Sequence, residues 1–280
     1  MPELPEVETV CRGLAKALSG ARIEAVTLHR KDLRIPFPAR LPDVAGARVE
    51  GVSRRAKYIL LKLDNAETMV VHLGMSGRMV ISGAAEGYNR EKHDHMLLQM
   101  QDGTRVVFND ARRFGLVDLV VTDGLEKHKL FRHLGPEPLE RGFDADYLAA
   151  RLKDKKVAIK LAIMDQTIVV GVGNIYASEA LFRAGIDPKR KARTIRKPEI
   201  VKLVAAIRAV LKDAIKAGGS SLRDYVQADG ELGYFQHSWA VYDKRGQKCK
   251  GCSCSLKKTG GIKKITQGAR STFYCPQKQK

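Results

Sequence analysis

The feature that most limits how this chain can fold is a change of periodicity near residue 121. From Arg22 to about Val121, short runs rich in Val, Ile, Leu and Met alternate with turn residues, and no helical spacing interrupts them. The predicted strands are Arg22–His29, Ala47–Val52, Tyr58–Asp64, Thr68–Leu73, Met96–Gln101, Arg105–Asn109 and Gly115–Val120. Asp102-Gly103 between two of these runs indicates a hairpin. Many short strands without helices between them predict an antiparallel β-sandwich.

Helical spacing flanks this β region on both sides. Apolar residues three or four positions apart predict a helix over Pro5–Leu18. After Pro136 the same spacing predicts helices over Asp144–Leu152, Ala158–Met164, Ile175–Ala184 and Glu199–Ala217. The last of these should end at Gly218-Gly219, because glycine readily adopts the left-handed conformation that follows a helix.

The predicted fold class is therefore α+β with three parts. Residues 1–135 should form an antiparallel β-sandwich domain with flanking helices, and residues 136–235 a helical domain. Residues 241–280 are basic and contain four of the five cysteines, which predicts a small module with a β-hairpin. A chain of 280 residues is long enough for such domains to have cores of their own.

The net charge of +19 indicates a polyanionic partner, either nucleic acid or an anionic membrane surface. No run of eighteen apolar residues is present, so no membrane span is expected. The opening MPELPEVETV lacks the basic and apolar segments of a signal peptide. A cytoplasmic location is therefore expected, with cysteines that are reduced or bound to metal.

The first residues could form a reactive amine. Removal of Met1 would expose the secondary amine of Pro2. An α-amino group has a pKa of about 7.7–8.0, against about 10.4 for lysine, so it is far more often unprotonated at neutral pH. Such an amine can attack a sugar C1′ and form a Schiff base, with Glu3 and Glu6 nearby as proton donors and acceptors. Taken alone, Met-Pro-Glu is also an ordinary way for a protein to begin.

Six sequence blocks, the first of which is this N-terminus, help to interpret it. They are MPELPEVETV, RRAKYILL, HLGMSGRM, DARRFG, GVGNIYASEALF and GARSTFYC, in this order along the chain. Together they closely resemble the formamidopyrimidine-DNA glycosylases of the Fpg/Nei family, and the resemblance covers essentially the whole chain.

The resemblance implies a bifunctional glycosylase and AP lyase of base-excision DNA repair. Its substrates would be 8-oxoguanine opposite cytosine and formamidopyrimidines, removed through a Schiff base at Pro2 and followed by β,δ-elimination. Glu3 would be the general acid and base, and Glu6 would support the site. Lys57 would contact DNA and assist β-elimination, and Arg270, on a hairpin over Ile262–Tyr274, would aid δ-elimination.

The resemblance also implies how DNA is held. Met75, Arg112 and Phe114 would fill the gap left by an everted nucleotide, because enzymes that act on a base take it out of the stack. This trio favours the purine-directed branch of the family. The other DNA-binding positions, part of them in a helix-two-turn-helix domain, would be His72, His93, Lys155, Lys160, Asn174 and Tyr176. A metal site at His93 and His95 is rejected, because no third ligand is near.

Cys249, Cys252 and Cys275 resemble the family's four-cysteine zinc module, but Lys278 stands where the fourth cysteine is expected. Four thiolates suit a tetrahedral structural zinc site. Three hypotheses remain open: Cys254 is the fourth ligand, zinc has three thiolates and an outside ligand, or the module folds without metal.

Two other functions remain as alternatives. One is a Nei-type enzyme for oxidised pyrimidines, and the other is a non-catalytic DNA-binding protein on the same scaffold. In the main interpretation the protein is a nucleoid-associated monomer that binds damaged double-stranded DNA. A loop over Ser220–Gln236 would then cover the everted base.

Overall fold

The computed structural model of the protein describes residues 2–220 and 233–280. Its contacts divide the chain into two compact units, each described by itself below. The first unit is Met1–Arg132 with Ile215–Gln236, and the second is His133–Ala214 with His237–Lys280. The loop predicted over Ser220–Gln236 falls mainly on residues 221–232, which lie outside the described residues.

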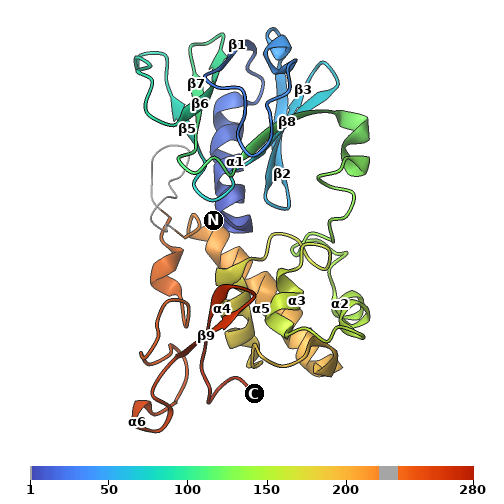
Figure 1. The fold of residues 1–280 in the computed structure, drawn as a ribbon, viewed down its shortest axis with the longest axis vertical. Helices are drawn as coiled ribbons and strands as arrows, with labels where there is room; N and C mark the ends of the chain where they lie inside the picture. The colour runs from blue at the N-terminus through green and yellow to red at the C-terminus, as the bar shows by residue number, and fades with distance from the viewer. Residues whose placement is uncertain (1, 221–232) are drawn as a thin grey trace. The chain divides into compact units, whose positions relative to one another are not determined.

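The first unit contains two antiparallel four-stranded sheets, with strand orders β1-β6-β7-β5 and β2-β3-β4-β8 (Figure 1). The strands are β1 (Ile23–Leu28), β2 (Val49–Arg55), β3 (Tyr58–Leu63), β4 (Glu67–His72), β5 (Arg78–Ser82), β6 (Asp94–Met100), β7 (Arg105–Asn109) and β8 (Leu116–Val121). Seven of them confirm the predicted strands, and β6 pairs with β7 across the predicted Asp102-Gly103 hairpin. The edge strand β5 was not predicted, because it is short and only one of its residues, Met79, is buried.

One apolar core lies between the two sheets. Met96, Leu98 and Phe108 of one sheet belong to the same buried cluster as Ile59 and Leu61 of the other. Burial of each such side chain contributes about 1.5–3 kcal/mol. This shared core confirms the predicted β-sandwich.

The helix α1 (Leu4–Leu18) packs against strands of both sheets, as Figure 1 shows. Its apolar stripe enters the shared core, where Leu14 and Leu18 are fully buried. A capping box fixes its first turn, because the backbone N–H of Glu3 donates to Oε2 of Glu6 over 2.8 Å. The core of the sandwich therefore anchors the start of the chain.

The second unit combines helices with one hairpin. The helices are α2 (Ala145–Leu152), α3 (Ile159–Met164), α4 (Asn174–Ala184) and α5 (Lys197–Lys216), and the hairpin strands are β9 (Lys263–Gln267) and β10 (Arg270–Tyr274). The last two residues of α5 belong to the first unit. The strand β10 packs against α4. These elements confirm the four helices and the hairpin predicted for this part of the chain.

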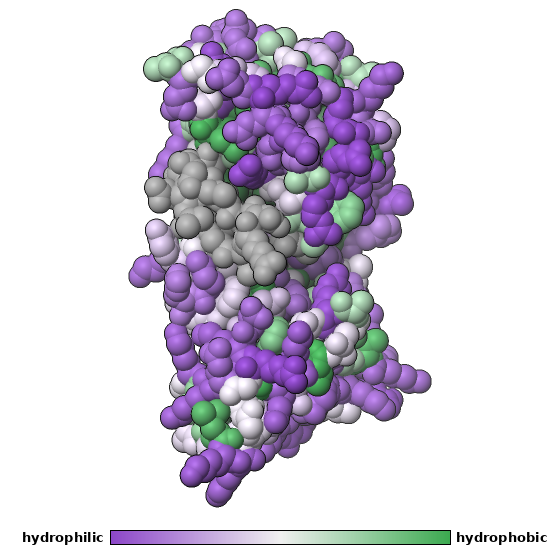
Figure 2. Space-filling model, turned by 60° about the vertical axis from the view of Figure 1, so that its left-hand side comes forward, coloured by the Kyte–Doolittle hydropathy of each residue, from purple (hydrophilic) through white to green (hydrophobic). Residues whose placement is uncertain are grey.

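Short helical turns complete the described fold. They are α6 (Leu256–Thr259) and the 3-10 helices Leu41–Val44, Thr122–Lys127, Ala192–Thr194 and Phe235–Ser238. Among the described residues there is no helix whose length and apolar character would let it cross a membrane. The face drawn in Figure 2 is mainly hydrophilic.

Candidate active site and nucleic-acid interface

The first turn of α1 brings Pro2, Glu3 and Glu6 together as buried groups; Glu3 is 3% exposed and Glu6 is 2% exposed. The two carboxylate oxygens of Glu6 have different partners. One accepts the N–H of Glu3, and the other accepts the N–H of Ser220 over 2.8 Å. A Cβ at Gly219 would lie 3.2 Å from Cγ of Glu6, so the backbone here approaches Glu6 closely. Glu6 thus ties the start of the chain to the segment that follows α5.

Lys57 lies in the turn between β2 and β3 of the same unit and is 8% exposed. Arg54 fixes this turn, because its guanidinium donates to the carbonyl oxygen of Ala56 over 2.8 Å and to Glu8 of α1 over 3.0 Å. Ala56 has a φ of +53°, a left-handed conformation that L-residues seldom adopt. A cation held by such a turn has a defined position before any substrate binds.

His72 at the end of β4 is an uncharged ring near neutral pH. Its pKa is lowered to about 4, mainly by burial and also by the positive charges of Lys57 and Arg34. Its Nδ1 accepts the backbone N–H of Gly74 over 3.0 Å, and its ring lies 4.9 Å from that of Tyr58. The remaining proton therefore sits on Nε2, so His72 can donate a hydrogen bond but brings no positive charge.

The three residues of the predicted gap-filling trio lie on two loops of the first unit. Met75 follows β4, whereas Arg112 and Phe114 lie between β7 and β8. Phe114 is 48% exposed, although aromatic side chains are usually buried. The guanidinium carbon of Arg112 lies 4.9 Å from the centre of the Phe114 ring. An exposed aromatic ring beside an arginine is suited to contact with nucleotide bases.

His93 and His95, near the start of β6, lie in different environments. His93 is partly exposed and has a φ of +79°, whereas His95 is buried. The Nε2 of His95 lies 2.8 Å from the carbonyl oxygen of Asp110, which makes His95 a structural residue. The pair is absent from the groups that could hold a metal among the described residues.

In the second unit, Asn174 begins α4 and joins it to the hairpin. Its side-chain N–H groups donate to the carbonyl oxygen of Ser271 over 2.9 Å and to the hydroxyl of Tyr242 over 3.2 Å. The ammonium of Lys160 donates to Oδ1 of Asn174, to the carbonyl oxygen of Ser271 and to the hydroxyl of Thr272. Asn174, a predicted DNA-binding residue, therefore makes these contacts from the first residue of α4.

Three predicted DNA-binding residues of this unit differ in exposure. Lys160 is fully buried and Tyr176 is 1% exposed, whereas Lys155 is partly exposed. A side chain enclosed by protein can act on DNA only through its neighbours, as Lys160 could through Asn174. Direct DNA contacts by Lys160 and Tyr176 remain a prediction, and the burial of both side chains does not favour it.

Arg270 is an exposed residue at the tip of the hairpin. The turn before it is Gly268-Ala269, in which φ is +52° and +58°. Two successive residues with positive φ are typical of the tight turn that joins twisted strands. This turn places Arg270, the first residue of β10, opposite Gln267 of β9.

Four cysteines of the second unit form one compact cluster: Cys249, Cys252, Cys254 and Cys275. Their sulfur atoms all lie within 4.8 Å of one another, with 3.1 Å between Cys249 and Cys254 and 3.8 Å between Cys252 and Cys275. Sulfur atoms about 2.3 Å from a tetrahedral zinc ion lie about 3.8 Å apart, so the cluster fits such an ion. The ammonium of Lys278, which stands where the fourth cysteine was expected, lies 4.1 Å from the centre of the Phe182 ring.

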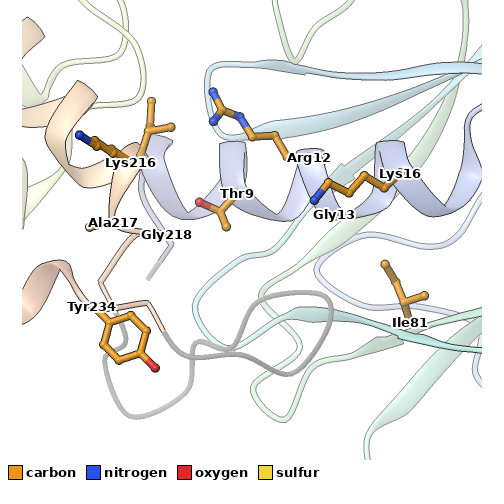
Figure 3. Close-up of a pocket in the computed structure, with 10 residues that line it drawn as sticks. Thr9, Arg12, Gly13, Lys16, Ile81, Lys216, Ala217, Gly218 and Tyr234 are labelled. Atoms are coloured by element: carbon orange, nitrogen blue, oxygen red, sulfur yellow. The ribbon is translucent and has the colours of Figure 1, made fainter.

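A cavity of about 610 Å³ in the first unit is separate from these groups (Figure 3). It lies along one side of α1, and its walls carry the cations Arg12, Lys16 and Lys216 and the ring of Tyr234. None of the predicted catalytic residues lines it. The candidate site is therefore defined by side chains and their contacts and not by this cavity.

Sequence reasoning missed two polar residues that connect the loops of the predicted gap-filling trio, Ser76 and Asp110. Asp110 is fully buried and its carboxylate accepts the hydroxyl of Ser76 over 2.6 Å. A usable signal was present, because Asp110 opens the DARRFG block directly after an apolar strand. A carboxylate at the end of a buried strand needs donors, and loops supply them.

Two family models match the chain. The formamidopyrimidine-DNA glycosylase N-terminal domain matches residues 1–117, and the formamidopyrimidine-DNA glycosylase H2TH domain matches residues 134–226. Two relatives, both named formamidopyrimidine-DNA glycosylase, align over their full length. The protein of Ruegeria pomeroyi is 52% identical and that of Rhodospirillum rubrum 50% identical, each covering 100% of both chains.

Solved structures agree with this assignment. A Lactococcus lactis FPG mutant in complex with Fapy-dG containing DNA has a TM-score of 0.90 and 33% identity over 100% of both chains. The Lactococcus lactis Fpg with abasic-site DNA has a TM-score of 0.89 and 33% identity over 99% of both chains. MutM with DNA containing carbocyclic 8-oxo-G has a TM-score of 0.88 and 33% identity over 100% of both chains. The chain therefore belongs to the formamidopyrimidine-DNA glycosylase family.

Proposed function

We propose that this protein is a base-excision DNA glycosylase that removes 8-oxoguanine and formamidopyrimidines and then cleaves the strand as an AP lyase. The observation that carries the proposal is the buried first turn of α1, in which Glu6 fixes the backbone beside Pro2 and Glu3. The DNA in the similar solved structures contains Fapy-dG, an abasic site or an 8-oxo-G analogue, which supports the same substrate class here.

The chemistry needs an amine, a proton carrier and cations. With Met1 removed, the nitrogen of Pro2 attacks C1′ as the bond from C1′ to the base breaks, and the base leaves with a proton. Loss of the amine proton and opening of the sugar ring give the iminium. Glu3 carries these protons and removes one from C2′, after which the 3′ phosphate leaves. A second elimination releases the 5′ phosphate.

Lys57 and Arg270 are the cations that we assign to the eliminations. Lys57 is held in a fixed turn near an uncharged His72, so the positive charge there comes from Lys57 and Arg34 and not from the histidine. Arg270 is presented by a tight hairpin turn and is exposed. A cation beside a phosphate that leaves stabilises the charge that develops there.

DNA binding would combine base and phosphate contacts. Met75, Arg112 and Phe114 fill the gap of the everted nucleotide, while His93 and Lys155 contact phosphates. Asn174 contacts a phosphate from the start of α4, with Lys160 holding its side chain. A net charge of +19 predicts that affinity falls steeply as salt rises, since bound counterions must be released. We expect a monomer acting on chromosomal DNA in the cytoplasm.

We infer that zinc, when bound, is held by Cys249, Cys252, Cys254 and Cys275. The close approach of Cys254 to the other three sulfur atoms supports the first of the three sequence-based hypotheses. The metal would be structural, because four thiolates leave no open position for a substrate. Its contribution would be to hold the base of the hairpin that carries Arg270.

Borohydride trapping tests the enzymatic proposal. Purified protein and a duplex with 8-oxoguanine opposite cytosine should give a covalent adduct, and mass analysis should place it on Pro2. Protein that retains Met1 should give none. A non-catalytic DNA-binding protein would give no adduct with any lesion, and a Nei-type enzyme would act faster on an oxidised pyrimidine than on 8-oxoguanine.

A further inference from the structure

We propose that Asp110 is a positioning residue that holds Met75, Arg112 and Phe114 as one preformed wedge. The inference rests on the proposed function, because it concerns how the gap of the everted nucleotide is filled. Asp110 itself is fully buried and lies at the junction of β7 with the loop to β8. It would act through the residues that it holds and not by touching DNA.

The carboxylate of Asp110 joins the two loops directly. Its Oδ1 accepts the hydroxyl of Ser76, the neighbour of Met75, over 2.6 Å. Its Oδ2 accepts the N–H of Gly115, the neighbour of Phe114, over 2.8 Å. A carboxylate that accepts hydrogen bonds from both loops fixes their separation, and charge-assisted bonds of this kind are the stronger class.

A second link runs through Ser76. The backbone N–H of Arg112 donates to the hydroxyl of Ser76 over 3.0 Å and to Oδ1 of Asp110 over 3.3 Å. Since the Ser76 hydroxyl donates to Asp110, it serves as donor to one residue and acceptor from the other. The backbones beside Met75 and at Arg112 are therefore bridged twice.

The backbones of the two loops also touch. A Cβ on Gly74 would lie 2.3 Å from the carbonyl carbon of Phe114 and 2.4 Å from the nitrogen of Gly115. Such distances exclude any side chain at Gly74, whose φ of +63° also favours glycine. The contact leaves little room for one loop to move without the other.

The backbone of Asp110 extends this network to the segment of His93. Its N–H donates to the carbonyl oxygen of His93 over 3.1 Å, and its own carbonyl oxygen lies 2.8 Å from Nε2 of His95. One residue thus connects the gap-filling loops with a segment that we expect to contact a DNA phosphate.

Preformed geometry matters most at the moment a base leaves the stack. A wedge that is already ordered fills the gap without a further loss of conformational freedom. The attack by Pro2 on a sugar that is already accessible makes no such demand. Loss of Asp110 should therefore impair reactions that need base eversion and spare the covalent chemistry.

The test compares two substrates in single-turnover experiments with the full-length processed protein. One is a duplex with 8-oxoguanine opposite cytosine, and the other is a single-stranded oligonucleotide with an abasic site, trapped with borohydride. Asp110→Ala should slow excision from the duplex about 100-fold, the size of effect that misplaced groups produce. Trapping on the single strand should change by no more than about twofold, as for an independent site.

Three further variants keep the test decisive. Asp110→Asn can still accept from Gly115 and should restore part of the duplex activity. Ser76→Ala removes one arm of the network and should impair only the duplex reaction, which is informative even if Asp110→Ala does not fold. Asp118→Ala, which removes a carboxylate from β8 of the same unit, should change neither reaction.

Equal losses on both substrates would show that Asp110 maintains the fold or the site as a whole, and no loss on the duplex would show that the wedge does not depend on it. Either result overturns the inference. Failure of the proposed function is a separate outcome, because the unaltered protein would then not excise 8-oxoguanine from the duplex, and a non-catalytic protein would also give no adduct with the abasic strand.

Discussion

The β-sandwich and the C-terminal residues 241–280, called the cysteine module below, hold their predicted site residues by different means. In the sandwich, α1 and both sheets share a large buried apolar cluster, which anchors the helix that follows Glu3 and the strand that follows Lys57. The cysteine module has a much smaller cluster, in which three of the seven buried residues are cysteines. A small core rarely suffices by itself, and a structural metal commonly supplements it.

The buried charged side chains also differ between the two units. Glu6 and Asp110 are buried carboxylates of the first unit and accept backbone N–H groups from other segments. Lys160 of the second unit is a buried ammonium and donates to Asn174 and to β10. The difference is that the loops of the sandwich rest on a large apolar core, whereas the hairpin with Arg270 has only a small apolar cluster, the contacts of Lys160 and four clustered cysteines beside it.

The largest effect is expected from removing Cys254. Cys254→Ala should abolish tight zinc binding, because three thiolates no longer close the tetrahedral site. Since zinc binding contributes about 10 kcal/mol or more in small zinc modules, the C-terminal residues should lose protection from hydrogen exchange. Metal analysis should fall from about one zinc per chain to none, while exchange in the β-sandwich stays unchanged.

Cys11→Ala is the matched control for that change. Cys11 is buried in α1 of the first unit and lies outside the cluster. This variant should keep its zinc and lose only a little stability in the sandwich. If Cys254→Ala retains zinc at full occupancy, Cys254 is not a ligand and the comparison between the two regions loses its main support.

A smaller effect, on rate and not on folding, is expected at the start of α1. Glu3→Gln should slow base excision by about 10²–10⁴-fold, because an amide cannot transfer the proton. Its melting temperature should stay close to that of the unaltered protein, since Gln can keep the capping role and α1 remains anchored in the core. Single-turnover excision and a thermal melt measure the two quantities.

Glu8→Gln provides the comparison, because it alters a carboxylate of the same helix that pairs with Arg54 and Arg12. Its excision rate should change little, because a glutamine oxygen can still accept the Arg54 N–H that helps to hold the turn of Lys57. A large loss of stability in Glu3→Gln with no separate loss of rate would mean that Glu3 is structural.

Periodicity was sufficient to predict most of the fold. Strands such as Tyr58–Leu63 and helices such as Leu4–Leu18 bury continuous apolar stripes, so their type follows from spacing alone. The edge strand β5 was missed because a strand with neighbours on one side needs little apolar sequence. The identity of the candidate site came from sequence blocks and not from periodicity.

The support of the site could not be predicted in the same way. Asp110 and Ser76 are 34 positions apart, and their bond depends on how β4 and β7 are paired with other strands. The burial of Lys160 was equally hidden, because its acceptors Ser271 and Thr272 lie more than 100 positions further along. Long-range polar contacts are set by tertiary packing, which local patterns do not encode.

The smallest expected effect concerns pH and shows where the sandwich itself is vulnerable. The pKa of His72 falls from 6.5 to about 4 in the folded protein. The unfolded chain therefore binds a proton first as the pH falls, and the folded state loses stability between about pH 6.5 and 4. Above about pH 6.5, titration of His72 no longer changes the stability of the folded state. From pH 7.5 to pH 5 the loss due to His72 is about 2 kcal/mol.

His72→Gln isolates this contribution. A glutamine oxygen can accept the N–H of Gly74, which His72 accepts now, but it does not titrate. Urea unfolding at the two pH values should show a loss that is about 2 kcal/mol smaller in the variant than in the unaltered protein. Equal losses in both would mean that the ring is not buried in an uncharged state.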